Sequence, residues 1–426
     1  MLARFLYAAQ LALGLAVCAS ALSYSTPPTT SQVEEIRAFT RNVEFGYLGW
    51  TLDAAWTKLQ ASSVAFPHSV EPRVRQQIVA DYLELTRRCL ELEADIERLY
   101  SLPPSRTQAA AANALQLELQ QTAERQQELA PLAEAVVEAE VAKILERLGL
   151  TVAGQPVPGV LFHITPLPSA LIVSPRDAIE QLVNISLETD LDLVSEIRLE
   201  TEIAEALDVS TLIVPIGGVG VYPTMVTRST DLPWLVETVA HEWVHNFLTL
   251  RPLGALYDAT PELRTMNETA AAIAGGEVAS IFMASSGNNP LVASRPEAPA
   301  SIPSAESEGD PPPPIPFDFN SEMHKTRVMV DALLAAGKVD AAEAYMEARR
   351  NRFVGNGYYI RRLNQAYFTF YGAYADVPGG AAGEDPVGAA VRGLRETSPS
   401  LADFLNRISW MTSFQQLMEA VNRPAS

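Results

Sequence analysis

The sequence predicts an α+β protein that is mostly helical, with a helical hairpin ahead of its central part. Heptad-like spacing of apolar residues fills most of residues 72–149. Short runs of β-branched and other apolar residues, typical of strands, follow Gly149. Helical spacing returns after residue 317 and predicts helices at about 319–336, 341–351, 358–374 and 401–421.

Composition limits the classes of function. The chain has 426 residues, of which 48% are hydrophobic, and its formal net charge is −20. It contains no basic run, so we expect no nucleic-acid partner, because phosphate contacts need clustered Lys and Arg. Cys18 and Cys89 are its two cysteines, which excludes a disulfide framework and a cysteine-based metal site.

The N-terminus has the pattern of a targeting or anchoring element. Arg4 is followed by an apolar run over residues 5–22, and no further charge appears until Glu34. The run is long enough for a single-pass anchor, whereas Ala19-Ser20-Ala21 offers a signal-peptide cleavage site. Both alternatives put the body on the far side of the membrane from Arg4. We therefore expect an extracytoplasmic protein, secreted or anchored to the membrane by this segment.

Changes of composition divide the chain into six parts. The Pro-, Ser- and Glu-rich stretch is too polar to build a core, so we interpret it as a flexible insertion. The parts are a signal peptide or anchor (1–26), a linker with a short amphipathic segment (27–71), a helical hairpin (72–149), an α+β half (150–284), the insertion (285–316) and a helical C-terminal half (317–426).

The hairpin shows an apolar seam. Leu102-Pro103-Pro104 separates its two helices, and Pro131 lies inside the second. The seam admits two interpretations: a dimerisation or partner-binding arm, or two antiparallel helices packed on each other and on the body. Its first helix carries Ile78, Tyr82, Leu85, Cys89, Leu92, Ile96 and Leu99, spaced alternately by four and three residues.

The strongest motif is His241-Glu242-Trp243-Val244-His245, which reads HExxH. On a helix, residues four apart share a face, so His241 and His245 can bind one metal ion. Glu242 follows the first ligand and can take a proton from a metal-bound water. Asp231 as N-cap and Pro233 in the first turn predict that a helix begins just before the motif.

A catalytic zinc site needs a third protein ligand. No histidine follows five or six residues after the motif, which excludes the metzincin pattern. Thr260-Pro261-Glu262 predicts a second helix start, and Glu268 lies inside that helix among small residues that permit close helix packing. Glu268 is therefore the predicted third ligand. Glu277, Glu262 and Asp258 are the alternatives.

These motifs resemble those of the gluzincin clan of zinc peptidases. The resemblance covers the two motif helices, HExxH and Asn267-Glu268-Thr269-Ala270-Ala271, and the layout is also similar to that of bacterial sequences assigned as aminopeptidases. It implies a thermolysin-like zincin catalytic core, Zn²⁺ held by His241, His245 and Glu268, and Glu242 as general base. Thermolysin-like members carry an Asp where this chain has Ala272. We expect Asn267 to take over part of its supporting role.

Acyl chemistry also needs a donor for the oxyanion that forms at the attacked carbonyl. The resemblance implies a Tyr or a His. His324, Tyr367 and Tyr371 are the candidates, and the two tyrosines fall on one helical stripe. Strand 211–215 or the glycine-rich segment 217–222 is expected to pair with an extended substrate.

The combined expectation is a zinc-dependent peptidase that cleaves peptide or protein substrates by Glu-assisted attack of a zinc-bound water, outside the cytoplasm. Two alternatives remain. One is a membrane-tethered scaffold protein with a non-catalytic zinc site, and the other is a zinc hydrolase of non-peptide substrates. Endopeptidase and aminopeptidase activity are not distinguished by these residues.

Overall fold

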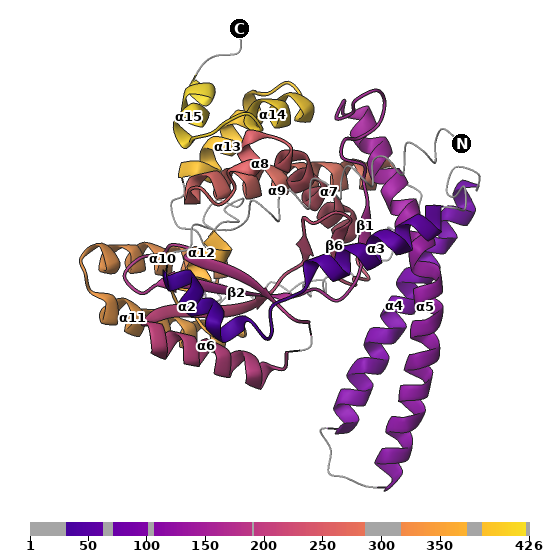
Figure 1. The fold of residues 1–426 in the computed structure, drawn as a ribbon, viewed down its shortest axis with the longest axis horizontal. Coiled ribbons are helices and arrows are strands. Elements are labelled where there is room, and N and C mark those ends of the chain that lie inside the picture. The colour runs from indigo at the N-terminus through magenta and orange to yellow at the C-terminus, as the bar shows by residue number, and fades with distance from the viewer. Residues whose placement is uncertain are drawn as a thin grey trace, which may run out of the picture.

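The computed structural model describes residues 31–62, 71–100, 106–189, 191–285, 317–372 and 386–422. Within these ranges the protein is mostly helical with two small sheets, which confirms the expected α+β class (Figure 1). A long helical hairpin extends away from the remainder of the molecule (Figure 1).

The described residues between 31 and 147 form four helices. Tyr82, Cys89 and Leu92 of the predicted seam are buried where the two long helices pack on each other. The second of these helices continues through Pro131. The four helices are α2 (Ser31–Thr40), α3 (Tyr47–Ser62), α4 (Pro72–Tyr100) and α5 (Arg106–Arg147).

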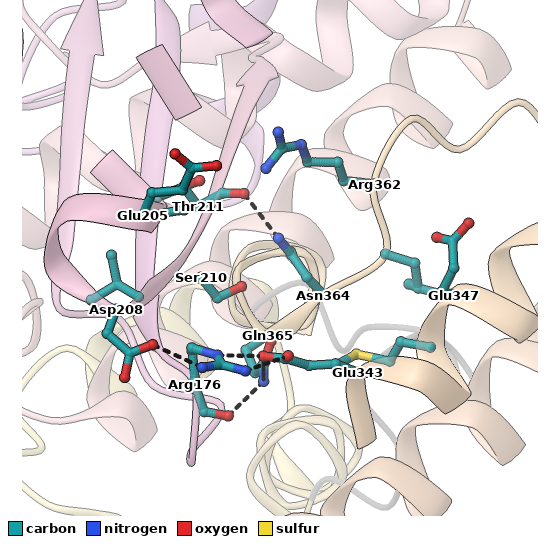
Figure 2. A pocket seen from close by; sticks show the side chains of 14 residues that line it. Arg176, Glu205, Asp208, Ser210, Thr211, Glu343, Glu347, Arg362, Asn364 and Gln365 are labelled. Atoms are coloured by element: carbon teal, nitrogen blue, oxygen red, sulfur yellow. Dashed lines mark hydrogen bonds and ion pairs between the residues drawn. The ribbon is translucent and has the colours of Figure 1, made fainter. Parts of the chain in front are cut away.

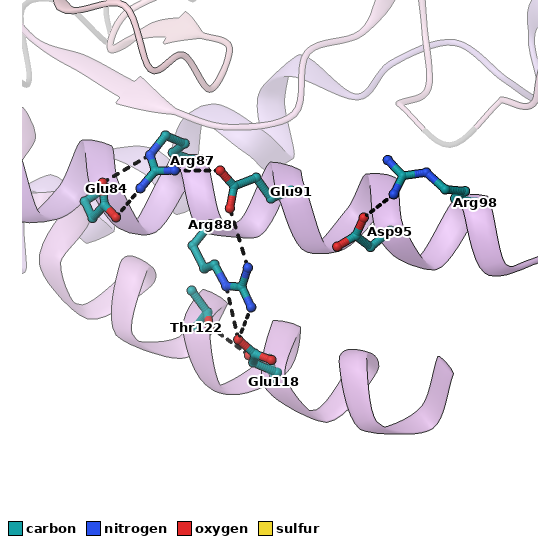
Figure 3. Close-up of polar contacts among 8 residues, drawn as sticks. All are labelled: Glu84, Arg87, Arg88, Glu91, Asp95, Arg98, Glu118 and Thr122. Atoms are coloured by element: carbon teal, nitrogen blue, oxygen red, sulfur yellow. Dashed lines mark hydrogen bonds and ion pairs between the residues drawn. The ribbon is translucent and has the colours of Figure 1, made fainter. Parts of the chain in front are cut away.

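The outer surface of the hairpin carries ion pairs (Figure 3). Arg87 pairs with Glu84 and Glu91 along α4, and Arg88 reaches across to Glu118 on α5. These side chains are exposed, so solvent screens each pair and it adds little to stability. The buried seam is therefore the main source of hairpin stability.

A buried charge cluster fixes the N-terminal helices to the body. Lys58 of α3 donates to Glu134 Oε2 (2.6 Å) and Glu138 Oε1 (2.7 Å) of α5. The same two carboxylates accept the backbone N–H groups of Ile164 (2.7 Å) and Phe162 (3.0 Å). The cluster thus joins α3, α5 and the strand at residues 162–164.

The larger sheet is buried on both faces. Ala170 and Ile172 of its central strand pack against α10–α12, whereas Leu171 and Val173 face α2 and α6. Burial on both faces explains its nearly continuous apolar runs. The sheet has the antiparallel order β3-β2-β4, with β2 (Ser169–Pro175), β3 (Val183–Leu187), β4 (Val209–Pro215) and α6 (Leu193–Leu207).

The smaller sheet leads to the HExxH helix. Its central strand, β6, is parallel to β1 and antiparallel to β5, and the edge strand β5 contacts α7. Its strands are β1 (Phe162–Ile164), β5 (Gly218–Val219) and β6 (Thr224–Val226).

The largest core lies around the two motif helices. Asp231 caps the first of them by accepting from the Trp234 N–H, as its sequence predicts. The second motif helix packs along the first, and the C-terminal helices and α5 cover the pair. This core contains α7 (Leu232–Thr249), α8 (Pro252–Ala255), α9 (Pro261–Ser285), α13 (Pro386–Thr397), α14 (Leu401–Ile408) and α15 (Phe414–Asn422).

A second helical group covers the larger sheet. It begins with Asp318, which caps its first helix. Residues 358–364, which we expected to be helical, form a loop in which Arg361 and Arg362 pair with the buried Glu200. The group consists of α10 (Phe319–Ala335), α11 (Val339–Gly355) and α12 (Gln365–Gly372).

The prediction of localisation needs correction. Among the residues that the structure describes, no helix has the length and apolar character needed to cross a membrane. The apolar run at residues 5–22 lies outside those residues, as does the predicted insertion at 285–316 except for its first residue. On this finding the expectation of an extracytoplasmic protein held by an N-terminal anchor does not stand.

Lys58→Met should lower the free energy of unfolding by about 3–5 kcal/mol, because it leaves two buried carboxylates without their cation. Urea denaturation followed by circular dichroism measures the loss. Lys143→Met is the matched control, since Lys143 pairs with Glu140 at the surface and its removal should cost less than about 1 kcal/mol. Equal losses in the two variants would contradict a stabilising role for the buried cluster.

Candidate metal centre

Three side chains from α7 and α9 converge on one point. His241 Nε2 and His245 Nε2 lie 3.0 Å apart, and each is 3.5 Å from Glu268 Oε2. Among the described residues this is the group of ligating side chains close enough to hold a metal ion. The structure therefore brings together the three ligands predicted from the sequence.

The triangle has the dimensions of a metal site. Ligand distances of about 2.0–2.2 Å in tetrahedral geometry place neighbouring donor atoms about 3.3–3.5 Å apart. Glu268 Oε2 is buried and has no hydrogen-bond partner, which is costly for an ionised oxygen unless a cation compensates it. The imidazoles of His241 and His245 remain partly exposed, so water can reach the cluster. These residues fit a bound metal ion.

Two neighbouring groups orient the ligands. Asn267 Oδ1 lies 2.8 Å from His245 Nδ1, so this nitrogen donates and Nε2 is the atom available to a metal ion in the cluster. The Tyr257 hydroxyl donates to Glu268 Oε1, which leaves Oε2 directed at the histidines. Asn267 thus has the supporting contact that we expected of it, although to His245 and through an amide instead of a carboxylate.

The electrostatics of the cluster also favour a cation. Burial alone would raise the pKa of Glu268, but the adjacent imidazoles of His245 and His241 hold it well below its ordinary value. Burial lowers the pKa of His245, but the charge of Glu268 outweighs this and raises the pKa to about 9. The carboxylate is therefore ionised over the neutral range, and a metal ion must displace a proton from His245.

Glu242 lies beside the ligands without joining them. Its side chain is buried, and burial raises its pKa, while His245 and His241 lower it and Glu268 raises it. A carboxylate with a raised pKa is a stronger base than a solvated one. Glu242 therefore has the position and the proton affinity of a general base.

The glycine-rich segment 217–222 passes directly over this base. A Cβ atom on Gly218 would lie 2.5–2.9 Å from atoms of the Glu242 side chain, and one on Gly220 would lie 3.0 Å from His245 Cβ. Asn246, one turn further along α7, donates to Val221 O at 3.2 Å. Glycine at position 218 thus leaves room for the Glu242 side chain, and glycine at position 220 avoids a tight contact with His245.

The two motif helices also touch through small residues. A Cβ atom on Gly275 would lie 2.9 Å from Glu237 O and 3.3 Å from His241 Cβ. Ala271 and Ala274 are buried beside it. The backbone of α9 therefore rests against α7 where the first ligand begins, as the small residues around Glu268 predict.

The predicted oxyanion donors lie elsewhere in the fold. Tyr367 and Tyr371 are on α12, with ring centroids 4.5 Å apart, and burial raises the pKa of both phenols. This helix packs on β2 and β4, in a core distinct from that of α7 and α9. His324 is on α10 of the same group. Their role as donors stays a prediction.

The loop before α12 lines a pocket of about 360 Å³ (Figure 2). Arg176 pairs there with Asp208 (2.8 Å) and Glu343 (2.7 Å), and Asn364 donates to Thr211 O (2.9 Å). These contacts connect α11 and α12 to the edge of the larger sheet. The polar side chains of this pocket therefore connect the larger sheet with the helices that pack on it. The metal ligands do not line it.

Two tyrosines near the site were not predicted. Tyr257 holds Glu268 from the loop between the motif helices. Burial raises the pKa of the Tyr47 phenol, its hydrogen bond with Ser186 lowers it, and the charge of Glu242 raises it, so Tyr47 lies within electrostatic range of the base. Sequence spacing carries no signal for either residue, because both reach the site through tertiary packing.

Comparison with models of protein families, with curated proteins and with solved structures found no match to this chain. The function must therefore be argued from the residues of the site.

Gly275→Ala should weaken metal binding, because the added methyl would push α9 away from the backbone of α7 and separate Glu268 from the histidines. We expect an affinity for Zn²⁺ at least about tenfold lower, with about 1–3 kcal/mol lost from the free energy of unfolding. A competition titration with a chromophoric chelator measures the affinity. Gly276→Ala is the control: its Cβ would meet nothing within 4 Å, so stability should rise by up to about 1 kcal/mol. Unchanged affinity in Gly275→Ala would refute this account of the helix contact.

Proposed function

We propose that the protein is a zinc-dependent peptidase of gluzincin type. The observation that carries the proposal is the triangle of His241 Nε2, His245 Nε2 and Glu268 Oε2, with Glu242 buried beside it. Two imidazoles and one carboxylate form the donor set of catalytic zinc sites, which keep a fourth position open. A purely structural zinc site has no use for a base such as Glu242.

A zinc ion in this site supplies Lewis-acid chemistry, since it lowers the pKa of a water and polarises a substrate carbonyl. Glu242 takes the proton that the attacking water loses and delivers it to the leaving amine. Its raised pKa suits both transfers, because the carboxylate binds the proton and then has to release it. Asn267 and Tyr257 keep the ligands in orientation throughout.

The substrate is a peptide in extended conformation. Strand β5 is the edge of its sheet and runs past Glu242, so its outer backbone groups are suited to pair with an extended chain. Of the two segments considered from the sequence, this arrangement favours 217–222, since β4 lies in the other sheet. A thermolysin-like zincin core is part of the proposal. It is supported by the helix pair α7 and α9 and by the edge strand next to the base.

Glu242→Gln should retain one zinc per chain and lower kcat for peptide hydrolysis by a factor of about 10²–10⁴, because the amide cannot accept a proton. Metal analysis of the purified protein and a fluorogenic peptide digest, with and without chelator, measure the two effects. Glu262→Gln is the matched control, since Glu262 is exposed at the start of α9.

Three outcomes would contradict the proposal. Hydrolysis that survives Glu242→Gln removes the assigned base. Zinc that stays bound in His241→Ala removes the assigned site. A wild-type protein that binds zinc and cleaves no peptide favours one of the two alternatives, and activity on ester substrates then separates a hydrolase of other substrates from a scaffold protein.

The affinity for zinc should depend on pH. Glu268 raises the pKa of His245 to about 9 against the effect of burial, so metal binding must release this proton at any lower pH. The apparent affinity should therefore rise by about tenfold per pH unit from pH 6 and level off near pH 9. An ordinary histidine would give a plateau near its reference pKa of about 6.5. Chelator competition across this range is the measurement, and a plateau that begins at pH 7 would show that Glu268 does not perturb His245.

A further inference from the structure

A pocket of about 510 Å³ is lined by Glu237 of α7 and by residues of α9 between Ala272 and Ile281. Glu237 lines it and precedes His241 by four residues, and Ala272 lines it and follows Glu268 by four residues. Residues four apart share a helix face. The end of the pocket that Glu237 and Ala272 line therefore lies on the same side of the helix pair as the ligands, one turn away from them.

Small residues leave open space in the pocket along α9. Ala272 and Gly276 follow one another at one-turn spacing on α9, and a Cβ atom on Gly276 would meet nothing within 4 Å. Ile273 and Ile281 add apolar surface around them. The volume lies within the range of about 300–1,000 Å³ typical of ligand pockets.

The pocket carries one uncompensated negative charge. Of its two carboxylates, Glu277 accepts two hydrogen bonds from Arg395, at 2.6 and 2.9 Å. Glu237 is exposed, and within the described part of the chain it has no ion-pair or hydrogen-bond partner. An apolar pocket with a free carboxylate at its rim matches a side chain that has an aliphatic stem and a cationic end.

We propose that this pocket binds a lysine or arginine side chain of the substrate, next to the bond that is cleaved, and that Glu237 selects it. The proposal rests on the peptidase function proposed above. One helix turn, about 5.4 Å, separates Glu237 from His241. Adjacent residues of a peptide have Cα atoms about 3.8 Å apart, so a residue flanking the cleaved bond can reach the pocket.

The test compares peptides that differ at one position. The zinc-loaded full chain digests N-acetylated, C-amidated peptides with lysine, arginine, norleucine or glutamate at each position that flanks the cleaved bond. We expect the wild type to favour lysine and arginine at one of these positions. Glu237→Gln should lower the ratio of kcat/KM for lysine over norleucine by about fivefold, as for a partly exposed ion pair, without loss of zinc. Glu237→Lys should shift the preference towards glutamate.

Two further variants serve as a charge control and as a test of the pocket volume. Glu262→Gln removes an exposed charge from α9 outside the pocket and should leave the lysine preference unchanged. Gly276→Leu puts a side chain into open space and should lower kcat/KM for both the lysine and the norleucine peptide. A wild type without preference for basic residues, or a preference that Glu237→Gln leaves intact, overturns the proposal.

A binding measurement separates this proposal from the peptidase proposal. The zinc-loaded Glu242→Gln protein is titrated with the lysine and norleucine peptides in a calorimeter. If no peptide is cleaved by the wild type but the lysine peptide binds more tightly in a Glu237-dependent way, the pocket assignment stands and the peptidase assignment falls. If peptides are cleaved without that dependence, the pocket assignment alone falls.

Discussion

The close approach of α7 and α9 is the constraint on which the site depends. Three donor atoms from two helices must lie within 3.0–3.5 Å of one another, and a displacement of about 1 Å would remove one of them from a metal ion. Gly275 and its alanine neighbours permit this approach because they place no group larger than a methyl between the two backbones. The same helices form the largest core, so the packing that stabilises the fold also sets the ligand geometry.

The second support of the site comes from the smaller sheet. The buried cluster of Lys58, Glu134 and Glu138 holds β1 against α5, β1 pairs with β6, and β6 carries β5 to Glu242. A continuous series of hydrogen bonds and packing contacts thus connects the cluster on α3 and α5 with Glu242, the proposed catalytic base. Asn246 of α7 donates a hydrogen bond to Val221 O and so connects the glycine-rich segment with α7 as well.

Sequence reasoning succeeded where the relevant contacts are local. His241 and His245 share a helix face by their spacing alone, and Asp231 and Pro233 locate the start of that helix. Glu268 was identified because a carboxylate inside a helix of small residues needs a partner, and the structure supplies two imidazoles. The α+β class followed from the same kind of local periodicity.

Sequence reasoning failed where tertiary contacts override local pattern. Periodicity over residues 358–364 favoured a helix, but Arg361 and Arg362 are held in a loop by the buried Glu200, which lies on α6. The expected single helix over 401–421 is two helices, with a break between Ile408 and Phe414. Tyr257 and Tyr47 reach the site from loops and helix starts that carry no distinguishing spacing.

The N-terminal segment is also bound to parts of the chain that are far away in sequence. Glu44 forms a β-bridge with Leu187, and the Phe45 N–H donates to Ser186 O at 2.9 Å. Loop closure over more than a hundred residues must precede these contacts, which makes them slow to form. During synthesis, which proceeds from the N-terminus, residues 44–47 emerge long before their partner strand β3 exists. The contacts that hold Tyr47 within electrostatic range of Glu242 therefore cannot form until residues 183–187 have been synthesised.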